Sequence, residues 1–495
     1  MKWGAKMLKS YEQQRLSAYE GLYEVVVDKE HILRKIKENI DFSFVNPMLK
    51  ESYCEHFGRP AKEPEMMFKQ EFLKKLYDLS DESLIQSIKV NMAYKYFLGM
   101  NPEDEPVDAS LMTKFRKTRI TEDILEEMLA ETVKQAIEKG IIKSRMIIAD
   151  ATHSKSSARQ ETPTQILRRL TKELRKELYR TQFEISGKFP EKPIETADLN
   201  EEISYSRKLI EAVKQAVEDK GSKKAKKALI KVTELLENEK IKEIQSLSDE
   251  DAKIGHKSES NPFFGYKTHI AMTEERIITG LEVTTGEAAD GKHLKKIVEQ
   301  SKDNGIIVEE ICGDTAYPSK DNLEYAKRNG IKMISKLNPI VSNAIDKEES
   351  GFIYNKDAGT YQCPAGNLST RKAMDNRKSD GNKNPRIVYY FDVEKCKTCP
   401  LKDGCYKDGA KSKTHKVIIP SDTHKEQKAF QETEYFKERA KQRYMIEAKN
   451  AEMKQAHGLG TADSNGLIAM RLQSYFTAFV VNVKRIVRLL EPKIA

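Results

Sequence analysis

The sequence has few cysteines and no long apolar stretch, and both shortages exclude classes of protein. Six of its 495 residues are cysteine, too few for the disulfide framework of a secreted protein of this length. No apolar run reaches the roughly 20 residues that a membrane-spanning helix needs, and residues 1–14 lack the apolar core of a signal peptide. We therefore expect a cytoplasmic protein with no membrane partner and no structural disulfides.

Charge is only mildly unbalanced. Lysine and arginine number 86 and aspartate and glutamate 77, which gives a formal net charge of +9. This balance suits a polyanionic partner such as DNA but does not require one. The length favours about two to four structural units with ample apolar core.

Residues 1–140 are predicted to form a helical N-terminal domain. Phe68, Phe72 and Leu76 follow the spacing of a half-buried helix face, and Ser80 and Thr121 stand where residues that cap helix N-termini are expected. Basic residues recur between the helices, so the domain either binds duplex DNA through its phosphates or is an ordinary packing domain. The basic residues in question are Lys114, Arg116, Lys117 and Arg119.

Residues 141–159 are predicted to hold the first strand of an α/β core. The run Met146–Ala149 is short and apolar, as in a buried strand, and Asp150 follows at its expected end. Residues 160–255 then change in composition and predict a helical hairpin inserted after that strand. Its basic cluster is either a solvated helix start or a contact to the DNA backbone. The cluster consists of Lys223, Lys224, Lys226 and Lys227.

Residues 256–337 are predicted to continue the core. They begin with a hairpin that turns around Glu274–Arg276, which is followed by a helix and by a strand that ends in Asp314. A helix capped by Ser319 and a further strand complete this part. Three antiparallel strands followed by alternating strands and helices is the ribonuclease-H-like order. We therefore predict an α/β fold with a ribonuclease-H-like catalytic core, an N-terminal helical domain and two insertions.

The second insertion, residues 338–420, carries four of the cysteines. A Cys-x2-Cys pair with two further cysteines can supply four thiolates to one tetrahedral zinc ion, and such an ion would stabilise a segment that is otherwise too polar to fold. We therefore predict a structural zinc knuckle. Its ligands are Cys363, Cys396, Cys399 and Cys405.

Residues 421–495 are predicted to form the last core helices. Lys437–Gly458 is expected to be one long helix that ends at glycine, with Arg443, Glu447 and Lys454 on one face. The ribonuclease-H-like order brings the first strand, the fourth strand and this helix together, and with them Asp150, Asp314 and Glu447. Taken singly, each of these acids could instead form surface ion pairs.

Three carboxylates from separate elements suit the cleavage of a phosphodiester. Two Mg²⁺ or Mn²⁺ ions can activate the attacking oxygen and stabilise the leaving oxygen, and Mg²⁺ needs few protein ligands because it keeps several waters. Asp150 is the expected bridge between the ions, and Asp314 and Glu447 each hold one. Arg443 and Lys454 are expected to contact phosphate oxygens of DNA.

The sequence resembles the DDE (Asp-Asp-Glu) transposases of bacterial insertion sequences, in particular the group with an N-terminal helical transposase domain and a cysteine-bearing insert before the glutamate. The resemblance covers about Asp28 to Leu490, and its N-terminal cues include GRPAKEPEMMFKQEFLKKLYDLSDESL, at residues 58–84. An Asp-x-Thr motif follows the first strand, and an Asp with a Tyr three residues later follows the fourth. The third motif has an Arg four residues before the Glu and a basic residue seven after it. The matching residues are Asp150 and Thr152, then Asp314 and Tyr317, then Arg443, Glu447 and Lys454.

One position departs from the family pattern, because Ala440 stands where members commonly have a tyrosine. This puts a helper contact in doubt but not the three acids. The resemblance implies binding to terminal inverted repeats, cleavage at the element ends and strand transfer into target DNA. It also implies a homo-oligomer on DNA, located at the bacterial nucleoid, with Thr152 and Tyr317 among the DNA contacts.

Two alternatives stay open. A related ribonuclease-H-like nuclease that only cuts DNA would share the three acids. An inactive, transposase-derived protein would bind DNA without cleaving it.

Overall fold

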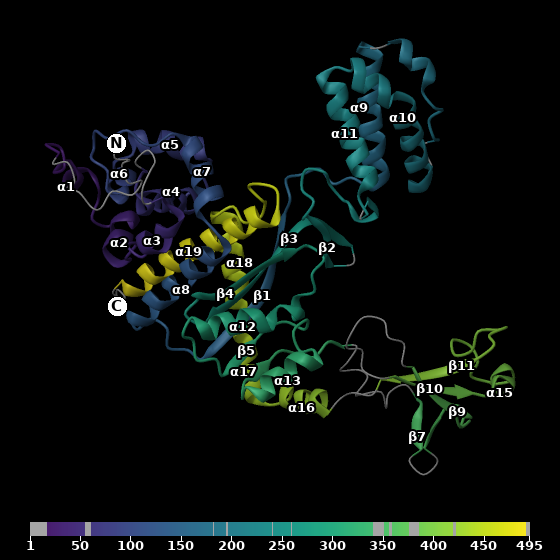
Figure 1. Ribbon diagram of the computed structural model, residues 1–495. Coiled ribbons are helices and arrows are strands. Elements are labelled where there is room, and N and C mark those ends of the chain that lie inside the picture. The colour runs from purple at the N-terminus through teal and green to yellow at the C-terminus, as the bar shows by residue number, and fades with distance from the viewer. Residues whose placement is uncertain are drawn as a thin grey trace.

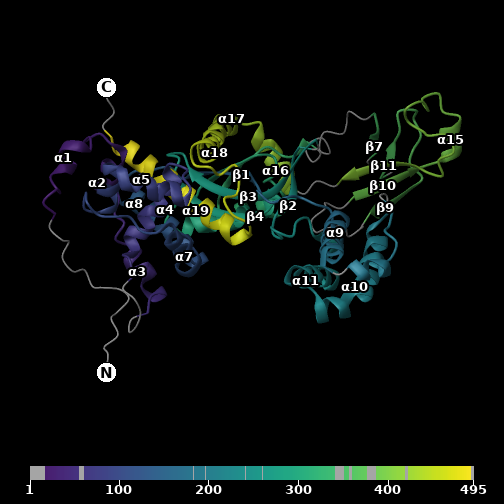
Figure 2. The same ribbon diagram turned by 90° about the horizontal axis from the view of Figure 1, so that it is seen from above.

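The computed structural model describes residues 17–54, 61–181, 183–194, 197–239, 241–258, 260–339, 351–355, 359–375, 386–418 and 422–491. A mixed sheet lies at the centre, with the N-terminal helices on one side and two smaller units projecting from the other (Figure 1). Figure 2 shows the same separation from above. Among the described residues, no helix combines the length and hydrophobicity needed to cross a bilayer.

The central sheet has the predicted succession of strands. β1 (Met146–Lys155) lies between β3 (Asn261–Thr273), which is antiparallel to it, and β5 (Glu310–Cys312), which is parallel. β4 (Ile278–Thr285) pairs with β3, and β6 (Lys332–Ile334) pairs with β5. The three antiparallel strands and the strand–helix alternation expected from the sequence are therefore confirmed. An additional strand, β2 (Lys253–Ser258), pairs with the start of β3 and was not predicted.

The position of Asp150 differs from the prediction, because β1 does not end there. Pairing with β3 continues from Asp150 to Lys155, whereas pairing with β5 stops at Ile148. The apolar run that marks a buried strand covers only the part of β1 that is enclosed on both sides. Beyond it the strand has one neighbour and alternates polar side chains, so the sequence predicted its end too early.

The N-terminal helices share their core with the sheet through the C-terminal helix α19 (Leu467–Leu490). Phe42, Phe68 and Phe72 each lie within aromatic contact of Phe479 on α19. The caps predicted from the sequence are confirmed, since the hydroxyls of Ser80 and Thr121 accept backbone N–H groups at the starts of α5 and α8. The helices are α1 (Leu22–Val26), α2 (Ile32–Asn39), α3 (Val45–Leu49), α4 (Pro64–Leu76), α5 (Asp81–Val90), α6 (Met92–Leu98), α7 (Ala109–Arg119) and α8 (Glu122–Glu138).

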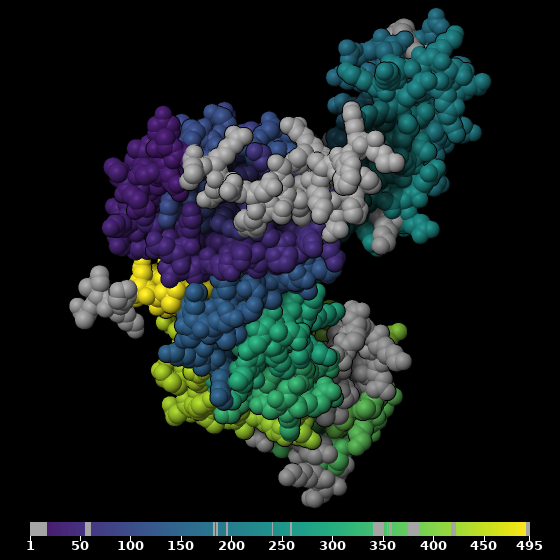
Figure 3. Space-filling model, turned by 60° about the vertical axis from the view of Figure 1, so that its left-hand side comes forward, coloured from purple at the N-terminus to yellow at the C-terminus, as the bar shows by residue number. Residues whose placement is uncertain are grey.

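Three helices between β1 and β2 form a separate bundle rather than the predicted hairpin of two. They are α9 (Pro163–Thr181), α10 (Leu199–Lys220) and α11 (Lys223–Glu237), and they enclose apolar clusters of their own. In Figure 3 the bundle projects from the rest of the molecule. Ile166, Leu170, Leu174 and Leu178 recur every four residues along α9 and are all buried.

A small β unit lies between β6 and the last helices (Figure 1). It holds a two-stranded sheet, a three-stranded sheet and one short helix within the described part of residues 351–418. These elements are β7 (Ile353–Asn355), β8 (Thr360–Gln362), β9 (Arg371–Asp375), β10 (Arg386–Phe391), α15 (Val393–Lys397) and β11 (Lys413–Ile418).

The predicted long helix is divided in the structure. After α16 (Asp422–Gln431), α17 (Glu434–Ala440) and α18 (Tyr444–Ala456) are joined by a 3₁₀ turn over Lys441–Arg443. The sequence gives no sign of this turn, because lysine, glutamine and arginine are all good helix formers. The predicted glycine stop is confirmed, since Gly458 has a left-handed φ of 68° just beyond α18.

Candidate active site

Asp150 lies within β1 and Asp314 lies two residues beyond the end of β5, which is shorter than predicted, and the two aspartates are close together. Ile148 of β1 pairs with Cys312 of β5, and each aspartate comes two residues later on its own segment. Burial raises the pKa of Asp150 to about 6, and the negative charges of Asp314 and Asp290 add to this effect. A backbone hydrogen bond at Ala151 and the charge of Arg443 oppose it. The structure therefore holds two of the predicted acids close enough to repel each other.

Helix α18 covers this pair with one face. The Asn450 amide donates a hydrogen bond to Asp150 Oδ2 at 2.9 Å. Arg443 and Lys454 both act electrostatically on Asp150, and burial lowers the pKa of Lys454. The sequence predicted Arg443 and Lys454 for this face. Asn450 was missed, although it lies three residues after Glu447 and therefore on the same side of the helix.

Glu447 lies on the same face but is not joined to the two aspartates. Its side chain is 62% exposed and accepts a hydrogen bond from Arg443 at 3.0 Å. The charge of Arg443 also acts on Asp150, so this arginine interacts with both the exposed glutamate and the half-buried aspartate. Among the described residues, no group of three or more His, Cys, Asp or Glu side chains is arranged to hold a metal ion.

A fourth acid, Asp290, belongs to this neighbourhood and was not predicted. It begins a short 3₁₀ turn before α12 (Leu294–Asp303) and accepts a hydrogen bond from Lys267 at 2.9 Å. The Asn322 amide fixes its segment beside Asp314, because it donates to the carbonyls of both Gly291 and Tyr317, at 2.7 and 2.8 Å. Its position just after the third core strand was the available signal.

Thr152 and Tyr317, predicted as DNA contacts, are both buried in the structure. Burial raises the pKa of Tyr317 well above its usual value, and the charges of Asp150, Asp290 and Asp314 add to this. The Tyr317 hydroxyl has no hydrogen-bond partner among the described residues. Neither side chain reaches a partner outside the protein without rearrangement.

Positive charge surrounds His153, which follows Asp150 on β1. Burial lowers the pKa of His153 to about 4, and the charges of Lys454, Lys257, Lys155 and Lys267 lower it further. The imidazole is therefore neutral at pH 7. This group of lysines creates a positive field beside the aspartates, which favours an approaching phosphate.

The four predicted zinc ligands line one small hollow of about 70 Å³. Burial raises the pKa of the Cys396 thiol, and the other three cysteines add to the effect. Cys399 Sγ also accepts the backbone N–H of Leu401 at 3.4 Å. The structure thus gathers the four thiols, although they do not form a metal-holding group in this arrangement.

Two segments of the chain match known families. Residues 22–118 match the transposase domain DUF772, and residues 362–487 match the transposase DDE domain. These matches support a DDE transposase of an insertion sequence. The DDE match contains Arg443, Glu447, Lys454 and the four clustered cysteines, whereas Asp150 and Asp314 lie outside both matches.

The name of one similar protein states no activity. A Rhizobium meliloti protein, named only as uncharacterized protein ORF8 in nfe locus, is 38% identical to this transposase over 85 residues. Those residues are 17% of this chain and 41% of that protein, so the transposase spans less than half of the relative. No solved structure matches the chain.

Proposed function

We propose that this transposase binds the terminal inverted repeats of its element, cuts DNA there and transfers the cut strand to a target. The carrying observation is that Asp150 and Asp314 come close together beneath the face of α18 that bears Asn450 and Lys454, with Arg443 in the 3₁₀ turn just before that helix. Two hard oxygen ligands beneath donors that suit a phosphate support the proposal, as does the strand order, which supports the ribonuclease-H-like assignment.

The donor set suits a divalent metal. Two half-buried carboxylates that lie close together gain by binding a cation, and Mg²⁺ prefers such oxygen ligands. We assign Asp150, Asp314 and Glu447 as the residues that hold two Mg²⁺ or Mn²⁺ ions. When bound, these ions activate the attacking oxygen and stabilise the leaving one.

The residues of the chain supply orientation and charge. The Asn450 amide fixes the Asp150 carboxylate and favours its ionised form, because an N–H donor stabilises negative charge. Glu447 completes the acid set when its ion pair with Arg443 opens, which also frees the Arg443 guanidinium for a phosphate oxygen. Lys454 contributes a second phosphate contact from the next turns of the helix.

The decisive test is strand cleavage and joining on a labelled duplex made from the DNA that flanks this gene. Wild type is compared with Asp314→Asn, with and without Mg²⁺. Metal-dependent nicking and joining that the variant loses is the expected result. Nicking without any joined product would instead identify a nuclease that only cuts, and binding without nicking in Mg²⁺ or Mn²⁺ would identify an inactive DNA-binding derivative.

We also propose that Cys363, Cys396, Cys399 and Cys405 bind one structural zinc ion. Their shared hollow and the N–H donor to Cys399 Sγ support this. Elemental analysis of purified protein should give about one zinc per chain, and Cys399→Ser should reduce it. A zinc-free preparation in which residues 351–418 remain folded would contradict the assignment.

The remaining parts of the proposal concern assembly. We propose that the N-terminal helices recognise the element ends, that the protein acts as a homo-oligomer on paired ends, and that it resides at the nucleoid. Their support is the family assignment and the excess of positive charge.

A further inference from the structure

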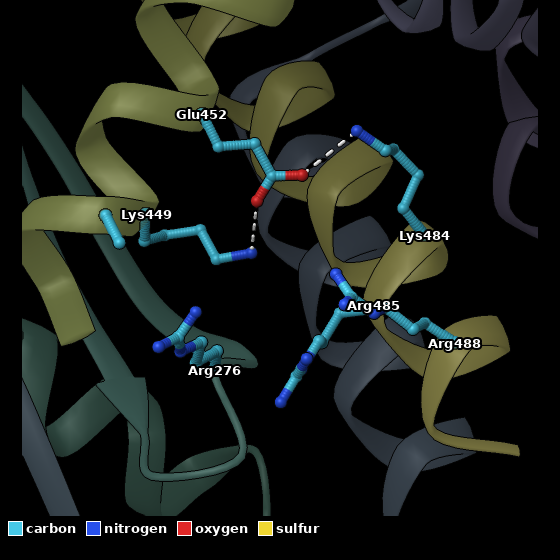
Figure 4. Close-up of a pocket in the computed structure, with 7 residues that line it drawn as sticks. Arg276, Lys449, Glu452, Lys484, Arg485 and Arg488 are labelled. Atoms are coloured by element: carbon cyan, nitrogen blue, oxygen red, sulfur yellow. Dashed lines mark hydrogen bonds and ion pairs between the residues drawn. The ribbon is translucent and has the colours of Figure 1, made fainter. Parts of the chain in front are cut away.

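A basic hollow of about 190 Å³ lies between α18, α19 and the turn that joins β3 to β4. Figure 4 shows side chains from all three elements around it. Five cationic side chains and a single carboxylate line it, so its formal charge is strongly positive. The lining residues are Arg276, Ala448, Lys449, Glu452, Lys484, Arg485 and Arg488.

The single acid neutralises only part of this charge. Glu452 accepts hydrogen bonds from Lys449 at 2.8 Å and from Lys484 at 3.0 Å, the two dashed contacts of Figure 4. Burial alone would raise the pKa of Glu452, but these two lysines outweigh it and lower the pKa to about 2. The negative charge of Glu452 is therefore paired with the two lysines, and the positive charges of the three arginines are left over.

Nearby acids balance only part of the charge of the arginines, since Glu452 and Glu275 act on Arg485. Arg485 donates through Nε to the Glu275 carbonyl, and neither Arg276 nor Arg488 forms an ion pair within the part of the chain that the structure describes. Burial lowers the pKa of Arg485, and the charges of Arg276 and Arg488 lower it further. A bound anion would relieve this repulsion.

The backbone at Arg276 gives independent support. Its φ of 68° is left-handed, a conformation that favours glycine or asparagine over arginine. The turn is held there from outside the hollow, because Arg439 binds Glu274 at 2.9 Å and the backbone of Lys143 and Ser144 donates to Glu275. A strained arginine on an anchored turn thus contributes its guanidinium to a hollow in which positive charge exceeds negative charge.

We propose that this hollow binds a phosphate group of the DNA backbone outside the cleavage site. Arginine forks match phosphate oxygens in pairs, and three of them around one hollow suit a phosphodiester. Glu447 and Glu452 are five residues apart, which separates them by about 140° around α18. The bound phosphate therefore belongs to a stretch of DNA on the other side of the helix from the one that is cut. This inference rests on the proposed function, since it requires a DNA substrate.

The test is the salt dependence of DNA binding. Each phosphate contact contributes about −0.9 to the slope of log K against log salt on duplex DNA. Arg276→Asn with Arg488→Ala should make this slope less steep by roughly one and weaken binding about tenfold near 100 mM salt. Asparagine tolerates the left-handed backbone at 276, so the melting temperature should not fall. Lys295→Ala with Arg328→Ala removes two exposed charges elsewhere and should leave the slope unchanged.

Two further measurements make the outcome decisive. Arg488→Ala alone, at an exposed position, serves if the double variant does not fold, and should show part of the change in slope. Inorganic phosphate, titrated against wild type, separates DNA from a small anion. An unchanged slope in the variants, or tight binding of inorganic phosphate with unchanged DNA affinity, would overturn the proposal. Because the readout is binding, a wild type that binds DNA but fails to cut it contradicts the proposed function and not this site.

Discussion

Replacing Asp150 by asparagine should stabilise the folded protein while abolishing its activity. Burial, assisted by Asp314 and Asp290, raises the pKa of Asp150 from 3.8 to about 6. One unit of pKa corresponds to ~1.36 kcal/mol, so keeping Asp150 ionised costs the folded state about 3 kcal/mol. Asparagine has nearly the same shape and can still accept the hydrogen bond from Asn450, but it carries no charge.

The effect has a defined pH window. The folded state binds this proton more tightly than the unfolded chain, so the group's contribution to stability is present below pH 3.8 and is lost as pH rises to about 6. Asp150→Asn should therefore raise the melting temperature by several degrees at pH 7.5, given about 2–4 °C per kcal/mol for a cooperative unit of 150–250 residues. At pH 4.5 the difference should fall to about a third of that, about 1 kcal/mol.

Differential scanning calorimetry at the two pH values measures this directly. Asp219→Asn, an exposed change on α10, is the matched control and should alter the melting temperature little at either pH. Adding Mg²⁺ should raise the melting temperature of wild type at pH 7.5 and leave that of Asp150→Asn unchanged. If Asp150→Asn melts at or below the wild-type temperature at both pH values, the buried-charge reasoning is wrong.

Three further substitutions separate the roles of the neighbouring side chains. Glu447→Gln should retain DNA binding and reduce cleavage by more than the roughly 100-fold that loss of an outer metal-site partner costs; cleavage at the wild-type rate would remove Glu447 from the acid set. Asp290→Asn should move the midpoint of the pH profile of Mg²⁺-dependent cleavage downward by less than about one unit, because one of the charges that raises the pKa of Asp150 is gone; an upward move would contradict this. Tyr317→Phe removes a buried hydroxyl without a partner and should stabilise the protein by about 1 kcal/mol in thermal unfolding; unchanged stability with lost cleavage would give the hydroxyl a part in the reaction instead.

Local signals predicted much of the fold. Apolar spacing and capping residues located α4, α5, α8 and α9, and the turn around Glu274–Arg276 placed the β3–β4 hairpin. These features depend on residues a few positions apart, which a sequence shows directly. The length of β1, the strand β2 and the division between α17 and α18 depend on partners far along the chain, and the sequence alone did not reveal them.

The sequence likewise predicted some residues of the candidate site and missed others. Asp150 and Asp314 were predicted as neighbours because strand order fixes them, and the structure places them two residues beyond a paired Ile148 and Cys312. Asn450 and Asp290 were missed because an amide within a charged helix and an aspartate before a helix look ordinary in sequence. Only the hydrogen bond to Asp150 and the link through Asn322 distinguish them.

The aromatic packing of the N-terminal helices on α19 also has a practical consequence for dissecting this protein. Cutting the chain after residue 140 would separate Phe42, Phe68 and Phe72 from Phe479 and expose apolar surface on both fragments. Helix α19 in turn contacts the sheet, where the Tyr475 hydroxyl donates to the Leu281 carbonyl of β4. DNA held by the N-terminal helices would therefore keep a fixed distance and orientation relative to Asp150 and Asp314. The distance between the recognised sequence and the cut would then be set by this packing and not by a flexible linker.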